Sequence, residues 1–266
     1  MRKKLLSIVA LAVTLLVVIG VSGCSKKEAN TSNLPTAKSL IDAGFNKGLT
    51  NGHFSGSINS TQMKQNSDIK GFFKGDSLVN LDYSITTKGK TQNESIWLTP
   101  DTAYFLLKAN KGHWIKNSAN ADNFDANQVT KRFNPSSFKS LNSSIEKVAL
   151  VKQNSNTYTV KYNGTDQNVW KHLNDFVVDT LNTPGTQNMQ IVRMVNASQP
   201  KNINITYTFN MANKKLTKVN MSADFSVNGQ YDFTWKLNYS ELGQHNNLSI
   251  PSDIQKNAVD VQNQDK

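Results

Sequence analysis

Hydrophobic residues between Leu34 and Leu49 recur at intervals of three and four, which places them on one face of an α-helix. Pro35 suits the first position of this helix, and Asn51-Gly52 ends it. From His53 the interval becomes two, and short polar turns separate the runs. Such alternation is typical of strands with one buried face and predicts an antiparallel meander. The alternating runs lie at 54–58, 69–73, 79–85, 95–98, 103–107 and 113–116.

Helical spacing returns in the middle of the chain, most strongly from Val169 to Leu181. Asp166 precedes this stripe where an N-cap residue is expected. The other elements predicted here are helices over 126–133, 136–141 and 187–196, and a hairpin that joins 146–152 to 157–162.

The alternation is clearest near the end, in 203–209, 219–227 and 231–239. Asn228-Gly229 between the last two runs predicts a two-residue turn with positive φ at Gly229. The segment 248–251 is predicted to close a sheet edge, because Pro251 cannot donate to a neighbouring strand. Each strand has one apolar face, and helices gathered on one side would bury it. The predicted fold class is therefore α+β.

The first 24 residues have the layout of a secretory signal. A basic start, Arg2-Lys3-Lys4, precedes an apolar run over 5–21. The run ends in Val21-Ser22-Gly23-Cys24, which resembles the lipobox of bacterial lipoproteins. The resemblance implies cleavage before Cys24, the single cysteine, and transfer of a diacylglycerol to its thiol. The alternative is an uncleaved transmembrane helix, for which the run is at the short end of the usual length.

The domain boundaries follow from these patterns. We expect a signal peptide at 1–23, the lipidated cysteine with a flexible tether at 24–33, one domain at 34–260 and a disordered tail at 261–266. The expected location is the outer face of the cytoplasmic membrane, where a lipid anchor would hold the protein.

The net charge of +11 is compatible with an anionic partner, and equally with a charge that only keeps the protein soluble. Loss of Arg2, Lys3 and Lys4 with the leader reduces 30 basic residues to 27 against 19 acidic ones, which leaves +8. Lipid head groups and anionic envelope polymers fit this charge. The lysines are scattered and the chain carries an export signal, so nucleic acid is not an expected partner.

The element order also resembles the half-barrel lipoproteins, which include the LolA/LolB-like carriers and the LppX/LprG-like lipoproteins, with many Gram-positive members. The resemblance rests on the lipobox, the tether, the first helix, the Trp-Leu-Thr-Pro-Asp corner at 97–101, the Gly-x-Trp strand at 112–114 and Ile250-Pro251. It implies a curved antiparallel sheet, a half-barrel, with helices packed on its concave face. Several members carry acyl chains between sheet and helices.

No residue pattern indicates catalysis, a metal site or a cofactor. The histidines, His53, His113, His172 and His245, are isolated. Ser67-Asp68-Ile69-Lys70 matches the Ser-x-x-Lys motif of acylating enzymes, but it lies in a predicted strand rather than at a helix start. Asp122 and Asp125 lack the ligand spacing of a calcium loop. We therefore expect a non-enzymatic protein.

Large apolar side chains on the predicted helices and strands could face one another across a ligand space. The candidate cavity-lining residues are Phe45, Trp170, Phe176, Met189, Phe225, Phe233 and Trp235. The same residues could instead fill an ordinary core. Two hypotheses remain open: a lipoprotein that binds or carries a hydrophobic or amphipathic, lipid-like ligand, and a non-catalytic structural or interaction protein of the cell envelope with a filled core.

Overall fold

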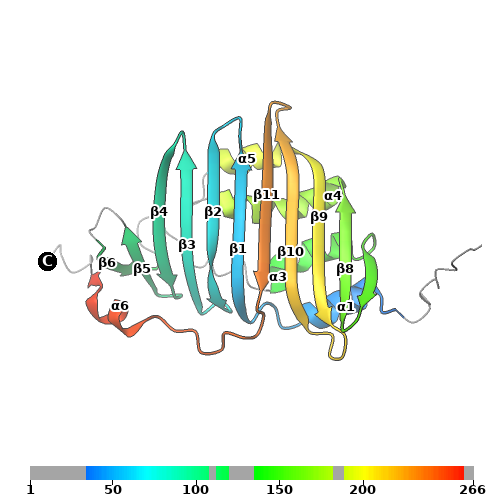
Figure 1. The fold of residues 1–266 in the computed structure, drawn as a ribbon, viewed down its shortest axis with the longest axis horizontal. Helices are drawn as coiled ribbons and strands as arrows, with labels where there is room; N and C mark the ends of the chain where they lie inside the picture. The colour runs from blue at the N-terminus through cyan, green and yellow to red at the C-terminus, as the bar shows by residue number, and fades with distance from the viewer. Residues whose placement is uncertain (1–33, 108–111, 120–134, 182–188, 261–266) are drawn as a thin grey trace, which may run out of the picture. The chain divides into compact units, whose positions relative to one another are not determined.

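The computed structural model describes residues 34–107, 112–119, 135–181 and 189–260 (Figure 1). The chain divides into two compact units, Met1–Leu34 and Pro35–Lys266, and every helix and strand described below belongs to the second. The predicted signal peptide, tether, helix over 126–133 and disordered tail lie outside the described residues, as do Cys24, Asp122 and Asp125.

The described strands form one sheet in the order β12-β6-β5-β4-β3-β2-β1-β11-β10-β9-β8-β7. Every pairing is antiparallel except the short parallel contact of β12 with β6. The strands are β1 (Asn51–Ser60), β2 (Gln65–Lys74), β3 (Leu78–Thr87), β4 (Lys90–Leu98), β5 (Thr102–Leu107), β6 (Trp114–Ser118), β7 (Leu150–Asn154), β8 (Thr157–Gly164), β9 (Gln199–Asn210), β10 (Leu216–Val227), β11 (Tyr231–Ser240) and β12 (Val259–Asp260).

The first and last meanders join through β1 and β11, which come from opposite ends of the domain. Phe54 pairs with Tyr239 and Ile58 with Trp235. All four side chains are buried, because they point to the same face of the sheet. The pairing therefore makes one continuous apolar surface from two separate runs of alternation.

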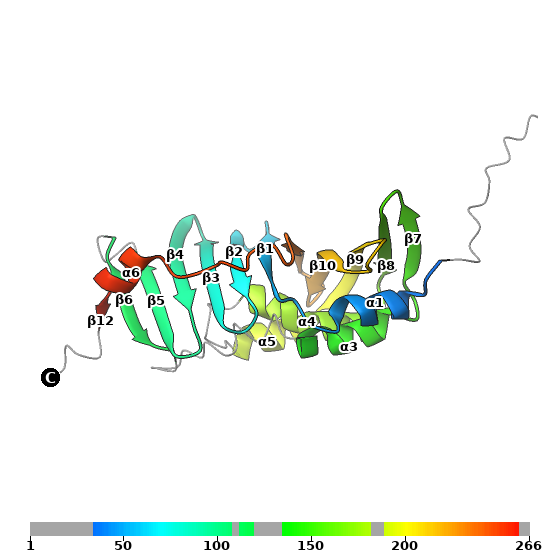
Figure 2. The same ribbon diagram turned by 90° about the horizontal axis from the view of Figure 1, so that it is seen from below.

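Four helices lie on that face: α1 (Ala37–Phe45), α3 (Pro135–Ile145), α4 (Gln167–Leu181) and α5 (Met189–Asn196) (Figure 2). A fifth, α6 (Ser252–Asn257), lies near β6 (Figure 1). We call the face that carries α1, α3, α4 and α5 the inner face and the opposite one the outer face. The predicted α+β fold, an open antiparallel sheet with helices on its concave face, is confirmed.

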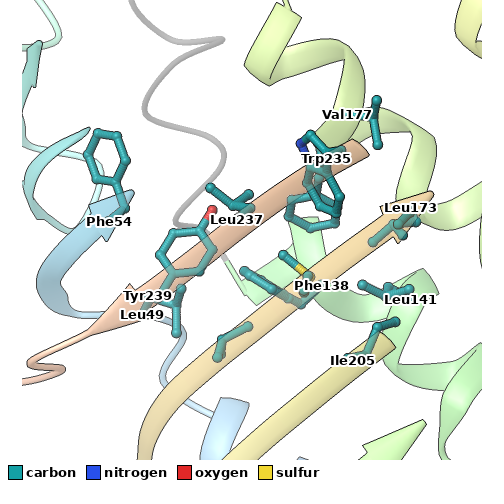
Figure 3. Packing of buried hydrophobic residues seen from close by; sticks show 14 of the residues in the cluster. Leu49, Phe54, Phe138, Leu141, Leu173, Val177, Ile205, Trp235, Leu237 and Tyr239 are labelled. Atoms are coloured by element: carbon teal, nitrogen blue, oxygen red, sulfur yellow. The ribbon is translucent and has the colours of Figure 1, made fainter. Parts of the chain in front are cut away.

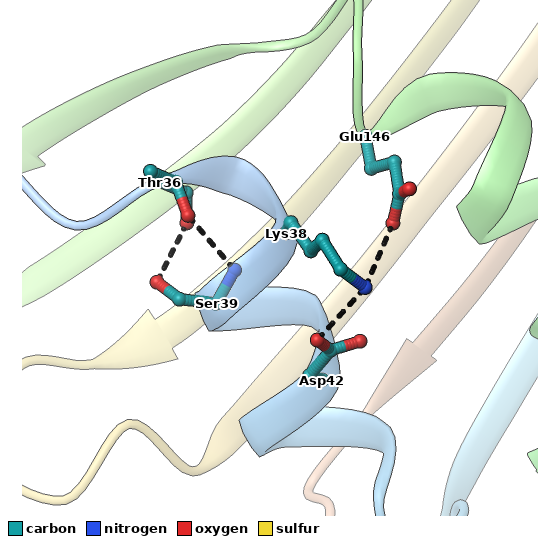
Figure 4. Close-up of polar contacts among 5 residues, drawn as sticks. All are labelled: Thr36, Lys38, Ser39, Asp42 and Glu146. Atoms are coloured by element: carbon teal, nitrogen blue, oxygen red, sulfur yellow. Dashed lines mark hydrogen bonds and ion pairs between the residues drawn. The ribbon is translucent and has the colours of Figure 1, made fainter.

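Side chains at its N-terminus determine where α1 begins. Thr36 Oγ1 accepts a hydrogen bond from the backbone N–H of Ser39 at 3.1 Å, so Thr36 is the N-cap residue (Figure 4). Pro35 lies before the cap and not at the first helical position as predicted. The Lys38 ammonium contacts carboxylate oxygens of Asp42 at 3.1 Å and Glu146 at 3.7 Å, which links α1 to the end of α3.

Asp166 caps α4 as predicted. One of its carboxylate oxygens, Oδ1, accepts hydrogen bonds from the backbone N–H groups of Asn168 at 2.7 Å and Val169 at 3.1 Å. The apolar stripe of α4 is buried against β1, β2 and β9. Figure 3 shows Trp235 of β11 lying close to Val177 of this helix.

Three local predictions need correction. The first helix ends at Phe45, and Asn51-Gly52 begins β1 rather than stopping the helix. Val227 pairs with Tyr231, so the turn between β10 and β11 contains three residues, although φ is positive at Asn228 and Gly229 as an Asn-Gly turn requires.

The third correction concerns the edge of the sheet. The segment 248–251 forms no strand, and Pro251 instead precedes α6. The edge position belongs to β12, whose Val259 pairs with Ile115 of β6. Proline fits directly before a helix, because the first turn of a helix needs no donor from that position.

Candidate functional site

Three of the predicted cavity-lining residues contact one another. The rings of Trp170 on α4 and Phe225 on β10 have centroids 5.0 Å apart. Phe225 and Phe233 on β11 stack with a centroid distance of 5.2 Å and an interplanar angle of 9°. All three side chains are buried. These aromatic residues therefore pack as a core and do not face each other across a gap.

A second aromatic group contains Phe45 and Phe176, joined by Phe138, which the sequence did not single out. Phe138 on α3 lies 5.1 Å from Phe45 and 5.0 Å from Phe176, measured between ring centroids. Trp235 is fully buried, and its indole N–H donates to Thr180. Met189 does not join these groups, because its side chain is 53% exposed at the start of α5.

The inner face continues beyond the strands that α4 contacts. Figure 2 shows β3 to β6 to one side of α3, α4 and α5. The inner-face side chains here include Tyr83 and Ile85 on β3, Glu94 on β4 and Phe105 on β5. Tyr83 is buried, whereas Ile85 and Phe105 are only partly buried at the margin of the core. We call these four residues the inner rim.

One polar contact lies within the inner rim. The Tyr83 hydroxyl donates a hydrogen bond to Glu94 Oε2, and the Gln92 side-chain amide donates to Glu94 Oε1 at 2.9 Å. Burial raises the pKa of Tyr83, and the hydrogen bond to Glu94 adds to the rise. Tyr83 therefore stays protonated and keeps Glu94 as an acceptor. The inner rim combines a polar acceptor with two apolar side chains, which suits a ligand that has a polar end and an apolar body.

The inner rim was missed because its members come from three strands. Tyr83 and Ile85 were recognised as part of an alternating run, but nothing adjacent in the sequence connects them with Glu94. The pairing of Tyr83 with Glu94 follows from the register of the β3–β4 hairpin, whose turn at Lys88-Gly89 has positive φ. Pairing residues outward from that turn, beginning with Thr87 and Lys90, leads to Tyr83 and Glu94, so the turn was the signal that could have identified this pair.

The structure separates the residues of the Ser-x-x-Lys match. Ser67 is buried on the inner face, where its hydroxyl donates to the backbone carbonyl of Thr180 at 3.3 Å. Lys70 lies three positions later on the strand and points to the outer face. A lysine on the other side of the sheet cannot take the proton of Ser67, so the motif does not form an acylating pair.

Two of the four histidines have polar neighbours. His53 Nδ1 lies 3.5 Å from the Ser240 hydroxyl, and His245 Nε2 lies 2.7 Å from a Glu241 carboxylate oxygen. No group of three or more potential metal ligands occurs among the described residues. The described helices also include none that is long and apolar enough to cross a membrane.

Residues 41–259 match the model of a family described as a family of unknown function, DUF6612. No curated protein matches the chain. Among solved structures, the chain is similar to a LolA superfamily protein, NE2245 from Nitrosomonas europaea, at 10% identity and a TM-score of 0.27, over 83% of this chain and 97% of that one. It is also similar to Rv2717c from M. tuberculosis at 8% identity and a TM-score of 0.21, over 79% of this chain and all of that one.

Proposed function

The chain belongs to the DUF6612 family, and we propose that it is a membrane-anchored extracytoplasmic lipoprotein that binds a hydrophobic or amphipathic ligand at the inner rim. The anchor is a diacylglycerol on Cys24, and the protein sits on the outer face of the cytoplasmic membrane. Its action is non-catalytic. The lipobox and the basic start of the chain support the anchor and the location.

The Tyr83–Glu94 hydrogen bond carries the assignment of the ligand site. A carboxylate beside apolar residues is costly to bury unless it keeps hydrogen-bond partners. Tyr83 and Gln92 supply two partners, and a ligand head group that donates a hydrogen bond, such as a hydroxyl or the protonated carboxyl of a fatty acid, would supply another. Partly buried Ile85 and Phe105 then offer apolar surface to the body of the same ligand.

Mass spectrometry and titration test this proposal directly. Native mass spectrometry of the full-length protein, purified in detergent from its own membrane, should show an additional lipid-sized mass. A fluorescent fatty acid should bind the parent, and Ile85→Asn should weaken binding about tenfold by removing apolar contact. Ser84→Asn is the matched control, because it makes a similar change one residue away on the outer face. Absence of any bound lipid and of fatty-acid binding by the parent would refute the proposal.

A second candidate function is that of a structural or interaction protein of the envelope. The contacts of Trp170, Phe225 and Phe233 favour it, because aromatic rings in mutual contact leave no ligand space between them. The net charge of the mature chain would then favour binding of anionic envelope polymers. This candidate predicts that the parent, like Ile85→Asn and Ser84→Asn, does not bind the fluorescent fatty acid.

A further inference from the structure

The outer face of β11, β1, β2, β3 and β4 carries short polar side chains in cross-strand rows. One row contains Asn238, Ser55, Lys70, Asp82 and Ser95 in successive strands. The next contains Lys236, Ser57, Asp68, Ser84 and Asn93. All ten residues line an open trough of about 630 Å³, which we call the outer trough. The rest of its lining comes from the residues that alternate with them along the strands: Gly56, Ile69, Tyr83 and Glu94. None of the described helices lies over these strands on this face (Figure 1).

The charges of the outer trough cancel. In the two rows, Lys70 and Lys236 stand against Asp68 and Asp82. The third carboxylate of the lining, Glu94, has its side chain on the inner face. Both aspartates already accept hydrogen bonds from neighbouring side chains. Asn66 donates to Asp68 at 2.5 Å, and Ser95 donates to Asp82 at 2.6 Å. A surface of balanced charge selects neither a strongly anionic polymer nor a cationic one, which favours an uncharged ligand.

Several hydroxyl and amide groups of the outer trough can form hydrogen bonds with a ligand. No hydrogen bond to another described residue involves the side chains of Ser57, Ser84 or Asn238, and no described carboxylate forms an ion pair with Lys70 or Lys236. Serine and asparagine have few rotatable bonds, so ordering them on binding costs little entropy. Dense donors and acceptors on a rigid sheet suit a ligand rich in hydroxyl groups.

Aromatic side chains border the outer trough on one side. In the next cross-strand row, Phe72 lies between His53 and Asn80, and Asn80 pairs with Trp97. Phe72 and His53 have ring centroids 5.0 Å apart, and Phe72 and Trp97 are partly exposed. A sugar ring has polar edges and an apolar C–H face, so it can bond to the polar rows and pack on these rings. The two rows contain no apolar side chain, which argues against a lipid ligand or an apolar protein partner.

We propose that the outer trough binds an uncharged polysaccharide chain. The chain runs across the strands, which are about 4.8 Å apart, so that successive sugar units meet successive side chains of the two rows. The balanced charge, the unused hydroxyl groups and the aromatic border carry the proposal. It does not depend on ligand binding at the inner rim, because the side chains of Tyr83 and Glu94, which border both sites, point to the other face of the sheet.

Titration of the detergent-purified full-length protein with cellohexaose and with chitohexaose tests the proposal. These neutral probes are straight, and they differ only in acetamido groups. We expect saturable binding of at least one, and we expect Ser57→Val with Ser84→Val to weaken it about tenfold by removing two hydroxyl partners. Thr206→Val is the matched control, because Thr206 points to the outer face of β9 beyond the trough. It should leave the affinity unchanged.

Three results would overturn the proposal: no binding of either hexasaccharide at millimolar concentration, equal affinity in the parent and the double variant, or tighter binding of inorganic polyphosphate than of both sugars. The melting temperature of the double variant shows whether it is folded. If it is not, Asn238→Ala replaces it, with the same expected direction. Fatty-acid binding, measured in parallel, shows separately whether the inner rim functions.

Discussion

The indole N–H of Trp235 donates a hydrogen bond to the hydroxyl of Thr180 at 3.0 Å, and both side chains are buried. The Thr180 hydroxyl in turn donates to the backbone carbonyl of Phe176 at 2.9 Å. This chain of two hydrogen bonds joins the centre of the sheet to α4 inside an apolar core. It satisfies the one polar atom that a buried tryptophan brings with it.

Thr180→Val should destabilise the protein by about 1–3 kcal/mol, because valine has a similar shape but leaves the Trp235 N–H without an acceptor. Thr180→Ser keeps the hydroxyl and should cost less. Chemical denaturation, followed by tryptophan fluorescence, gives both free energies. Equal losses for valine and serine would show that the methyl group and not the hydrogen bond matters.

Phe176→Ala should lower the free energy of unfolding by about 3–5 kcal/mol, as expected for an aromatic residue removed from a packed core. Phe176 is 3% exposed and contacts Phe138, so the lost volume cannot be refilled by water. Met189→Ala, at an exposed position, should change stability by less than about 0.5 kcal/mol. A small loss for Phe176→Ala, together with altered fatty-acid uptake, would instead place a ligand beside α4.

Gly229→Val should destabilise the β10–β11 hairpin by roughly 1 kcal/mol or more. The φ angle of Gly229 is +67°, a region that β-branched residues resist, and an added Cβ would meet no atom within 4 Å. The cost would therefore come from the backbone alone. Asn228→Gly, at the neighbouring positive φ, should be nearly neutral. Thermal unfolding measures both variants, and an unchanged melting temperature for Gly229→Val would contradict the assigned turn.

Stability should fall at alkaline pH through Tyr83 and Tyr207. Burial raises the pKa of both hydroxyls above the ordinary value of 10.0. Above pH 10 the unfolded chain therefore releases these protons while the folded chain holds them, which favours unfolding. Each tyrosine should contribute a slope of about 1.4 kcal/mol per pH unit in that range and none below it.

Tyr83→Phe and Tyr207→Phe should each flatten this alkaline slope. Tyr207→Phe also leaves Asn142 Oδ1 without its donor, which lies at 2.9 Å, so it should lower stability at neutral pH as well. Denaturation curves between pH 8 and pH 11 separate the two effects. A slope equal to that of the parent in both variants would contradict the role of these hydroxyls.

Cys24→Ser should abolish lipid attachment, because only the thiol can take the diacylglycerol. The variant should then leave the membrane fraction, and mass spectrometry should show the acyl mass in the parent alone. Ser25→Ala, one residue along, is the control and should remain anchored. If Cys24→Ser still partitions with membranes like the parent, the apolar run over 5–21 acts as a transmembrane anchor.

Features that depend only on residues close together along the chain could be predicted from the sequence. The strand alternation of 203–239, the apolar stripe of α4 and its cap at Asp166 all appear in the structure. Each depends on the chemistry of residues within a few positions of one another, where period and capping leave little choice. The α+β class follows from the same local patterns, because alternating strands with one apolar face need helices to cover it.

Only the tertiary structure decided which distant segments meet. One alternating pattern is compatible with many strand orders, so the pairing of Phe54 with Tyr239 and the parallel contact of β12 could not be derived from it. Likewise, apolar stripes show that Trp170 and Phe225 are buried but not that their rings touch. Whether facing side chains enclose a space or fill it depends on their volumes and rotamers in three dimensions. The inner rim and the outer trough exist for the same reason: strand register gathers on each face residues that the sequence keeps apart.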